Sequence, residues 1–250
     1  MPTDAMSPGG GAPAIRAVGL AKRFGLIRAV DDVTFDLVSG RIYGLLGPNG
    51  SGKTTLIRLL AGLTHATAGH AEVLGATMPS RTTLERIGYM TQSDGVYPAL
   101  SVEENARFFA SMYGVSADGA VEESLALVEL ADRRRSLTGT LSGGQRRRLS
   151  LACAVIHRPP VLFLDEPTVG VDPLLRVQFW SYFRSLADGG ATIVVSSHVM
   201  DEADRCDELL FVRAGKIIAR GSSRELRDRA GTTDLEQAFL RFAGDAEAAR

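Results

Sequence analysis

The sequence contains few of the residues that would indicate a secreted, membrane-spanning or nucleic-acid-binding protein. Its two cysteines, Cys153 and Cys206, are too few for a disulfide framework and lack metal-ligand spacing, so we expect both to be reduced in a cytosolic protein. The formal net charge is -1, and no overall basic field argues for nucleic acid. No apolar run is long enough to span a bilayer, and residues 1–13 lack the apolar core of a signal peptide. Their Gly, Pro and Ala content predicts a disordered tail.

Lysine is also scarce, and one of the three lysines lies in a glycine-rich loop. Lys53 belongs to GPNGSGKTT, which fits G-x-x-x-x-G-K-[ST] and has an apolar strand before it and a helical pattern after it. Glycines let consecutive backbone N–H groups point inward as an anion site, and the helix adds the positive end of its dipole. The alternative is a glycine-rich turn that precedes a lysine by chance. Such a turn would not be expected to have a strand directly before it and a helix directly after it. We therefore expect a phosphate-binding loop made of Gly47, Pro48, Asn49, Gly50, Ser51, Gly52, Lys53, Thr54 and Thr55.

Two side chains of this loop have predicted chemical roles. Lys53 would reach the β- and γ-phosphates of a nucleotide. The Thr54 hydroxyl is placed to bind Mg²⁺, a hard cation that prefers oxygen ligands.

Elsewhere the apolar patterns alternate between strand and helix, as in an α/β domain with a sizeable core. Predicted strands are residues 15–24, 33–37, 42–46, 71–74, 86–90, 161–164 and 191–196, with a terminal hairpin at 207–213 and 216–220. Helical periodicity covers residues 102–112, 120–130, 145–156, 223–229 and 235–242. The first three of these helices predict a helical subdomain, residues about 95–158, inserted into the α/β frame.

Two consecutive carboxylates, Asp165 and Glu166, follow the apolar run 161–164. Four hydrophobic residues without alternation indicate a strand buried on both faces of a parallel sheet, and ligands bind at the carboxyl ends of such strands. Asp165 would hold Mg²⁺, and Glu166 is then free to polarise the attacking water as a general base. His198 follows another buried strand, at the same edge, and could contact a γ-phosphate. Gln92, after the strand 86–90, could bind the metal or orient a water, although a lone Gln usually does neither.

The motif LSGGQ, residues 141–145, predicts a second anion site in the chain. Ser142 is a good helix N-cap, and the two glycines that follow expose backbone N–H groups at the start of a helix. The arginines at 146–148 lie at the unfavourable end of that helix dipole if stability alone mattered. They could form a solvated face, and we assign a solvated face to the run 133–135. Asp172 is placed to cap the helix that starts at Pro173.

Phe24 has two interpretations that the residues alone leave open. Its position just upstream of the sheet favours a core aromatic, since buried aromatic rings contribute much of a core's packing. The other interpretation is a stacking platform for a nucleobase.

Together these motifs resemble the nucleotide-binding subunit of ABC transporters, from about Ile15 to Phe242. The resemblance rests on GPNGSGKTT, Gln92, LSGGQ, VLFLDEP, the turn at 170–172 and His198, all in the order and spacing of that family. It is closest to the lone ATPase subunits of multidrug-type exporters, through residues 96–105 and 235–240. The resemblance implies an ABC ATPase domain at 14–242 and a C-terminal tail at 243–250. Its fold would be a P-loop NTPase core with a mostly parallel sheet, an N-terminal antiparallel β subdomain and the inserted helical subdomain.

The resemblance also implies a role for each matching residue. Phe24 would stack on the adenine of ATP, Lys53 would act in catalysis, and Gln92 would sense Mg²⁺ and the membrane partner. Glu166 would activate water, and His198 would contact the γ-phosphate. The residues that would reach a nucleotide held mainly by the opposite subunit of a head-to-tail dimer are Ser142, Gly143, Gly144, Gln145 and Asp172.

The implied function is a Mg²⁺-dependent ATPase that powers transport, in the export direction, through a separate integral membrane permease. The chain would then lie at the inner face of the cell membrane, held there by the permease. One alternative is a soluble ABC ATPase acting on ribosomes or DNA, but such chains carry two cassettes or long coiled coils, and neither is present here. A P-loop small-molecule kinase is a second alternative, and the LSGGQ motif argues against it.

Overall fold

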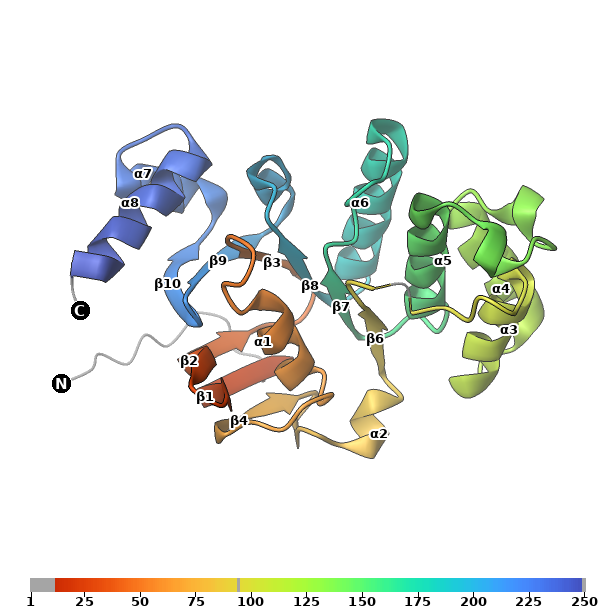
Figure 1. The fold of residues 1–250 in the computed structure, drawn as a ribbon, viewed down its shortest axis with the longest axis horizontal. Coiled ribbons are helices and arrows are strands. Elements are labelled where there is room, and N and C mark those ends of the chain that lie inside the picture. The colour runs from red at the N-terminus through yellow and green to blue at the C-terminus, as the bar shows by residue number, and fades with distance from the viewer. Residues whose placement is uncertain (1–11, 94, 249–250) are drawn as a thin grey trace.

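A six-stranded sheet lies at the centre of the structure, a computed structural model that describes residues 12–93 and 95–248 (Figure 1). Across the sheet the strands are β10 (Lys216–Gly221), β9 (Glu208–Arg213), β3 (Ile42–Leu46), β8 (Thr192–Ser197), β7 (Val161–Asp165) and β6 (Ile87–Met90). All neighbours pair in parallel except β9 and β10. Every residue of β3, β7 and β8 is buried, as expected where both faces of a parallel sheet are covered. The mostly parallel sheet predicted from the sequence is confirmed.

A second, antiparallel sheet is built mainly from the N-terminal part of the chain. Its strand order is β2 (Ile27–Leu37), β1 (Ile15–Phe24), β4 (Ala68–Val73) and β5 (Ala76–Thr77). Val33, Phe35 and Leu37 alternate with less buried neighbours along β2, the pattern of a strand with one face on the core. This confirms the predicted antiparallel β region, in which β2 begins six residues before the predicted 33–37 and β4 begins three residues before the predicted 71–74 and ends at Val73.

Eight α-helices among the described residues surround the two sheets. They are α1 (Lys53–Leu60), α2 (Arg81–Leu84), α3 (Val102–Met112), α4 (Ala117–Leu127), α5 (Gly143–Val155), α6 (Pro173–Asp188), α7 (Ser223–Ala230) and α8 (Leu235–Ala248). The bounds of α3 are those predicted. Helix α4 lies earlier than the predicted 120–130, and α5 begins before the predicted residue 145, because Ser142 caps it with its side chain.

Two predictions about the chain's organisation need correction. The predicted helix 120–130 ends early, at Leu127, and the chain then forms turns and the short 3-10 helices Ala131–Arg133 and Thr138–Thr140 before α5. At the C-terminal end, α8 passes the predicted limit at Phe242 and reaches Ala248, and it buries Ala243 completely. Residues 243–248 therefore continue a packed helix rather than forming a tail. Most of the predicted N-terminal tail, 1–13, lies outside the described residues.

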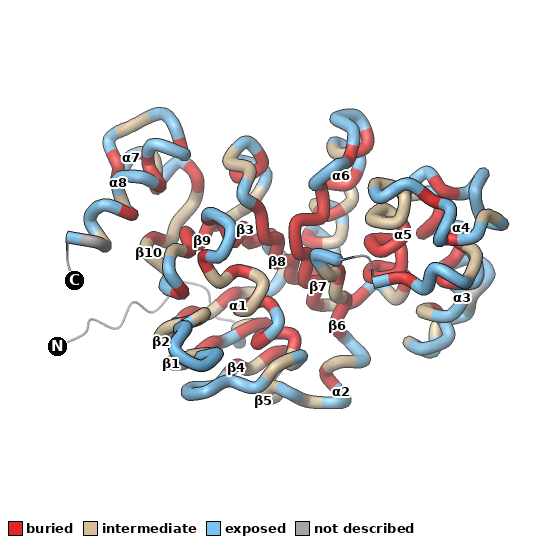
Figure 2. The backbone as a smooth tube through the Cα atoms, in the orientation of Figure 1, coloured by how far each residue is buried: buried red, intermediate tan, exposed pale blue. Residues whose placement is uncertain are grey.

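The core explains how the helices are attached to the central sheet. One buried cluster runs from α3, α4 and α5 through Leu162 and Leu164 of β7 to Phe179 and Phe183 of α6. A second cluster fills the space between the two sheets and includes Leu56 and Ile57 of α1. Figure 2 shows the buried residues concentrated along the central strands. Among the described residues, no helix is both long and apolar enough to cross a bilayer.

Candidate functional site

The phosphate loop leaves the carboxyl end of β3 and enters α1 at Lys53. Two of its glycines are required by close packing. A Cβ atom at Gly47 would lie 2.1 Å from the carbonyl oxygen of Val212, and one at Gly52, where φ is 109°, would lie 2.2 Å from that of Ala29. The loop is thus wedged between the terminal hairpin and β2, and only glycine allows it to lie there.

Lys53 is buried, although it carries a charge. Its ammonium group donates hydrogen bonds to the carbonyl oxygens of Gly47 (2.7 Å) and Pro48 (3.0 Å). Burial lowers the pKa of Lys53, and the nearby carboxylates of Glu166 and Asp165 oppose that shift. The lysine is therefore held at the loop by neutral carbonyls, a weaker set of partners than a phosphate would provide.

A cavity of about 240 Å³ lies against this loop and brings other predicted site residues to it. Gln92 and Glu166 line the cavity together with Lys53. The remaining lining residues are Ile27, Arg28, Ala29, Asn49, Gly50, Gly52, Thr54, Thr55 and Ala214. The loop amides and Lys53 give this cavity hydrogen-bond donors for an anionic ligand.

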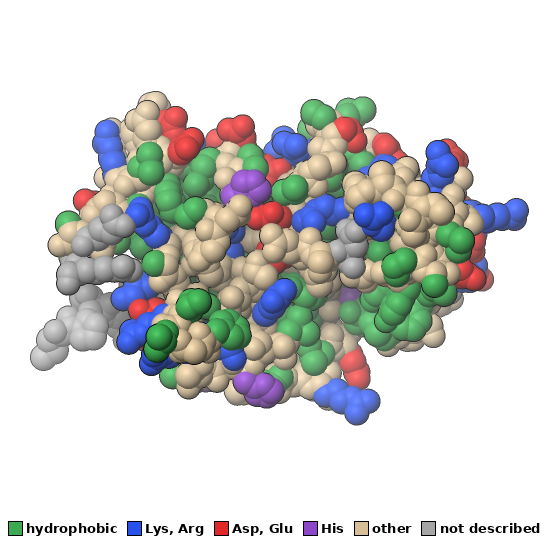
Figure 3. All heavy atoms as spheres, viewed as in Figure 1, with side chains coloured by type: hydrophobic (Ala, Val, Ile, Leu, Met, Phe, Trp, Pro, Cys, Tyr) green, Lys and Arg blue, Asp and Glu red, His purple; other side chains and the backbone are tan. Residues whose placement is uncertain are grey.

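Phe24 is not part of the core. The side chain is 54% exposed, and its ring lies across the β1–β2 turn from Ile27, which lines the cavity. The ammonium group of Lys22 lies 5.0 Å from the ring centroid, a cation–π contact. The interpretation as a core aromatic is therefore wrong, because β1 ends in a turn that projects from the antiparallel sheet. Figure 3 shows hydrophobic side chains exposed at this turn.

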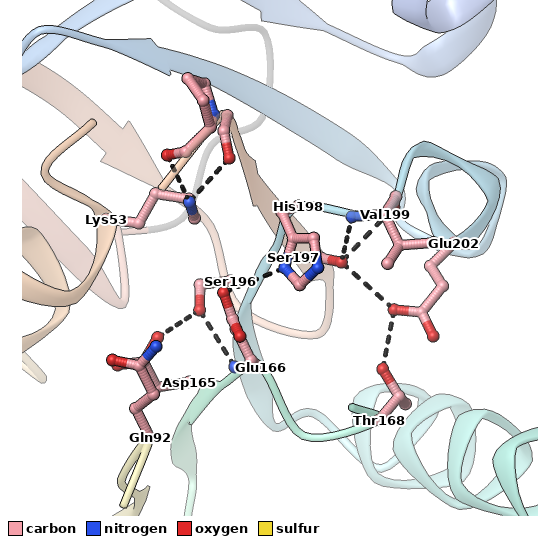
Figure 4. Close-up of polar contacts among 12 residues, drawn as sticks. Lys53, Gln92, Asp165, Glu166, Thr168, Ser196, Ser197, His198, Val199 and Glu202 are labelled. Atoms are coloured by element: carbon pink, nitrogen blue, oxygen red, sulfur yellow. Dashed lines mark hydrogen bonds and ion pairs between the residues drawn. The ribbon is translucent and has the colours of Figure 1, made fainter. Parts of the chain in front are cut away.

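Asp165 and Glu166 occupy the carboxyl end of β7, where Asp165 pairs in register with Ser196 of β8. The Ser196 hydroxyl donates to Oδ1 of Asp165 and accepts the backbone N–H of Glu166 at 3.1 Å. Oδ2 of Asp165 is buried without a protein partner, and Figure 4 shows Asp165 with its bond to Ser196. A buried carboxylate oxygen without a partner is costly, so it fits a site for a cation.

Glu166 and His198 come together because β7 and β8 are parallel neighbours that end at the same edge. Nδ1 of His198 lies 3.1 Å from Oε1 of Glu166, a hydrogen bond whose donor depends on the histidine tautomer (Figure 4). The backbone of Glu166 is left-handed, with φ at 55°, a conformation that costs energy for any residue other than glycine. The strained residue is thus the one whose side chain lines the cavity.

The LSGGQ segment lies outside this cavity. Ser142 and Gln145 form a capping box at the start of α5, with hydrogen bonds of 2.9 and 3.2 Å, which confirms the predicted N-cap. None of residues 142–145 lines the cavity at the phosphate loop. A Cβ atom at Gly144 would lie 3.2 Å from the carbonyl oxygen of Gly170, so the segment lies beside the loop that leads to Asp172. Asp172 caps α6 by accepting the N–H of Leu175 at 3.0 Å, also as predicted.

Two residues of this region were not predicted to take part. Arg147 donates to the main-chain carbonyls of Gln92, Asp165 and Glu166, so it is not simply part of a solvated face. Its unfavourable place in the helix dipole was the sequence signal that could have identified it. Glu202 is buried and accepts from Thr168 (2.9 Å) and Ser197 (3.4 Å), and no sequence pattern distinguishes it (Figure 4).

The basic run 133–135 is exposed, as the solvated interpretation requires. Arg134 nevertheless forms two hydrogen bonds, of 2.7 and 2.9 Å, with Glu103 in the first turn of α3. An exposed pair of this kind contributes little to stability, typically less than about 1 kcal/mol.

The central parallel sheet, the glycine-rich loop entering α1 and the carboxylates at the end of β7 define a P-loop nucleoside-triphosphate-binding domain of the α/β class. The sequence pattern of the family described as "ABC transporter" matches residues 30–169. The chain belongs to that family.

Individual relatives agree with this assignment. The chain is 40% identical to the "Probable multidrug ABC transporter ATP-binding protein YbhF" of Escherichia coli, over 94% of this chain and 42% of that protein. It is 42% identical to the "Nod factor export ATP-binding protein I" of Burkholderia lata, over 82% of this chain and 69% of that one. The chain thus spans less than half the length of the Escherichia coli relative.

Solved structures show the same fold. A structure titled "Structure of ATP binding subunit of ABC transporter" superposes with a TM-score of 0.85 at 26% identity, covering 92% of this chain and 99% of that one. A dimeric ATP-binding cassette in a post-hydrolysis state, bound to ADP and Pi, superposes with a TM-score of 0.77 at 23% identity, over 83% of this chain and 98% of the other. The second likeness supports the fold alone.

Proposed function

We propose that this chain is the ATP-hydrolysing subunit of an exporter and that it works with a separate membrane permease. The observation that carries the proposal is the arrangement at the carboxyl ends of β7 and β8. There the carboxylate of Glu166 lies in the cavity of the phosphate loop, within hydrogen-bond reach of His198. A base beside a phosphate-binding loop is the arrangement that hydrolysis of a terminal phosphate needs.

In this proposal each residue has a task that its surroundings support. Glu166 accepts a proton from the attacking water, and His198 orients the carboxylate and contacts the γ-phosphate. Lys53 exchanges its bonds to the carbonyls of Gly47 and Pro48 for stronger bonds to phosphate oxygens. Phe24 offers its exposed ring to the adenine, next to Ile27 at the other end of the cavity.

The donors at this site fit Mg²⁺. Thr54, Gln92 and Asp165 offer a hydroxyl, an amide oxygen and a carboxylate oxygen, all of the hard type that Mg²⁺ prefers. The described residues contain no cluster of three or more acidic, His or Cys side chains that could hold a metal alone. This agrees with an ion that is bound together with the phosphates and keeps several waters. Bound there, Mg²⁺ would neutralise charge on the β- and γ-phosphates.

A groove beside the nucleotide cavity supports the proposed permease contact. Its cavity of about 520 Å³ lies between the α1–α2 region and helices α3 and α5. Leu63 and Met112 line it and are each 53% exposed, and Arg81 and Glu85 add charge. Figure 3 shows hydrophobic side chains gathered over α3 at this end of the molecule. Exposed apolar side chains in a groove suit an amphipathic helix of a partner, so we place the permease contact here. The permease would hold the chain at the inner face of the membrane.

A head-to-tail dimer would complete each nucleotide site. Residues 142–145 form an anion-binding helix start that does not line the chain's own phosphate cavity. In a symmetric dimer each chain can present this segment, with Asp172 nearby, to the phosphate loop of the other. The names of the relatives, a multidrug transporter and a Nod factor exporter, support export as the direction.

The proposed function is tested by the substitution Glu166→Gln. Removing the base should lower ATP hydrolysis by about 100-fold or more, while binding of ATP and Mg²⁺ remains near wild type, because the amide keeps the shape of the side chain. Steady-state phosphate release and nucleotide titration measure the two quantities. Glu236→Gln, at an exposed position of α8, is the matched control and should behave as wild type. Turnover of Glu166→Gln within a few-fold of wild type would contradict the proposal.

A further inference from the structure

Arg147 joins three segments that meet at the nucleotide site. It lies in α5, soon after the LSGGQ segment. Its guanidinium donates to the carbonyl oxygen of Gln92 (2.9 Å) after β6, to that of Asp165 (2.9 Å) at the end of β7, and to that of Glu166 (3.0 Å). One side chain therefore fastens the start of α5 to the main chain of both carboxylates and of the glutamine beside them.

The bond to Glu166 acts on a strained residue. Glu166 has a left-handed backbone. Its N–H donates to two atoms of Ser196, the carbonyl oxygen at 3.2 Å and the hydroxyl oxygen at 3.1 Å. Arg147 holds the carbonyl on the other side of the same residue. A left-handed conformation at a residue other than glycine persists only where its surroundings over-determine it, and here both peptide groups are fixed. The direction of the Glu166 side chain follows from that backbone.

The two neighbouring arginines of α5 donate to carbonyl oxygens of other segments. Arg146 donates to the carbonyl of Leu141 at 2.6 Å, and Arg148 donates to that of Val128 at 3.0 Å. Both acceptors lie within residues 95–158, the range predicted for the helical subdomain. Arg147 is also suited to the task chemically, since a guanidinium has five N–H donors in a rigid fork and a lysine has three at one point.

We propose that Arg147 is a positioning residue for ATP hydrolysis, which sets the backbone of Glu166 and of Gln92 relative to α5. The proposal rests on the proposed role of Glu166 as the base. In this arrangement the base is correctly aimed only while the start of α5 lies against the end of β7. Because the same helix carries the LSGGQ segment, a movement of that segment is transmitted to the catalytic carboxylate of its own chain.

The first test compares Arg147→Gln and Arg147→Lys with Arg148→Gln as the matched control. We expect Arg147→Gln to lower kcat by about tenfold or more, with the Kd for ATP within about threefold of wild type, since only the aim of the base changes. Arg147→Lys should restore little of kcat, because it keeps the charge but not the fork. Arg148→Gln should have the kcat and the Kd for ATP of the wild-type protein. Equal losses in kcat and ATP affinity, or full activity in Arg147→Gln, would overturn the proposal.

A second test shows whether Arg147 acts through Glu166. In a Glu166→Gln background, Arg147→Gln should cause almost no further loss of the residual rate, because a side chain that is no longer a base does not need to be aimed. The same factor of loss in both backgrounds would refute action through Glu166. If both Arg147 variants failed to fold, by circular dichroism and thermal melting, Arg147 would be a folding residue and the proposal would be wrong.

A third measurement does not depend on hydrolysis. Amide hydrogen exchange in the peptide covering residues 161–171 should be faster in Arg147→Gln than in wild type, and unchanged in Arg148→Gln, in the protein without nucleotide. Unchanged exchange in Arg147→Gln would show that the hydrogen bonds of Arg147 do not hold this backbone. Wild-type hydrolysis and its loss in Glu166→Gln test the proposed function separately, so the two ideas can fail independently.

Discussion

Asp165 and Glu166 are adjacent in the chain but have different surroundings, and this difference fits the different roles proposed for them. Asp165 is 1% exposed, with one oxygen bonded to Ser196 and the other without a partner. Glu166 turns out of the strand through its left-handed backbone, so its carboxylate meets His198 and the cavity. Because successive side chains of a strand point to opposite faces, only this change of backbone lets both carboxylates serve one site.

At the same scale we expect Lys53→Ala to weaken nucleotide binding itself. The substitution removes a charged hydrogen-bond donor from the phosphate end of the cavity, and such bonds contribute about 1.5–3 kcal/mol, or about 10- to 150-fold in Kd. Titration with a fluorescent ATP analogue measures the change. Lys216→Ala, at an exposed lysine paired with Asp31 at 3.4 Å, should bind as wild type. An unchanged Kd in Lys53→Ala would exclude the assigned phosphate contact.

At the scale of elements, the segment between β6 and α3 links the nucleotide cavity to the groove. Asn105, buried in α3, anchors this segment with bonds to the N–H and carbonyl of Tyr97 (2.8 and 3.0 Å) and to Thr138 (3.0 Å). Tyr97 is 49% exposed, and its ring packs edge-to-face on that of Phe108, with 5.1 Å between the ring centroids. A backbone held by a buried amide thus presents an exposed aromatic ring beside the groove, which a partner could contact.

We predict that Tyr97→Ala uncouples ATP hydrolysis from transport. ATP binding should remain, because Tyr97 does not line the nucleotide cavity. Transport per ATP hydrolysed should fall, because loss of an aromatic anchor of about 1.4 kcal/mol weakens docking of the permease about tenfold. Transport and ATPase assays in vesicles containing the permease give this ratio. Leu240→Ala, a 60% exposed residue of α8, is the control and should leave the ratio unchanged. Cross-linking from Tyr97 that captures no membrane protein would contradict the docking proposal.

At the scale of the whole molecule, the two predicted anion sites of the chain lie on different elements. One precedes α1, and the other is the start of α5, outside the phosphate cavity. The start of α5 satisfies part of its own backbone through the Ser142–Gln145 capping box. In the proposed dimer, a site divided in this way within a chain would be completed when a second copy brings its α5 to the first copy's phosphate loop.

Mixed dimers test this division. A chain carrying Lys53→Ala is mixed with a chain carrying Gly144→Asp, which places an anion where the γ-phosphate should lie. In the mixed dimer one composite site has both defects and the other has none, so about one quarter of wild-type ATPase activity should return if sites turn over independently. Phosphate release after equilibration of the subunits is the measurement.

The control for the mixed dimers puts both substitutions on one chain, which is then mixed with wild type. Every mixed dimer then has two damaged sites, and only wild-type homodimers remain active, again about one quarter. If each site were completed within one chain, the first mixture would stay inactive while the second kept about one half. Those values would show that the dimer model is wrong.

Much of this protein follows from short-range patterns in its sequence. The glycines and Lys53 of the phosphate loop, the buried strand before Asp165 and the caps at Ser142 and Asp172 depend on neighbours a few residues away, and the structure has them as predicted. Backbone propensity, capping and burial on both faces of a strand act over such distances, so the order of the residues is enough to recognise them.

Other features depended on the tertiary structure, because they join residues far apart in the chain. The exposure of Phe24 depends on the position of the β1–β2 turn, and the burial of Ala243 depends on the elements against which α8 packs. The hydrogen bond of Arg147 to Gln92 joins residues that are 55 positions apart in the chain. Packing decides such contacts, since a side chain's surroundings are set by the elements that meet around it rather than by its neighbours in sequence. The sequence alone therefore determined which residues could bind a nucleotide, and the fold decided which of them lie together.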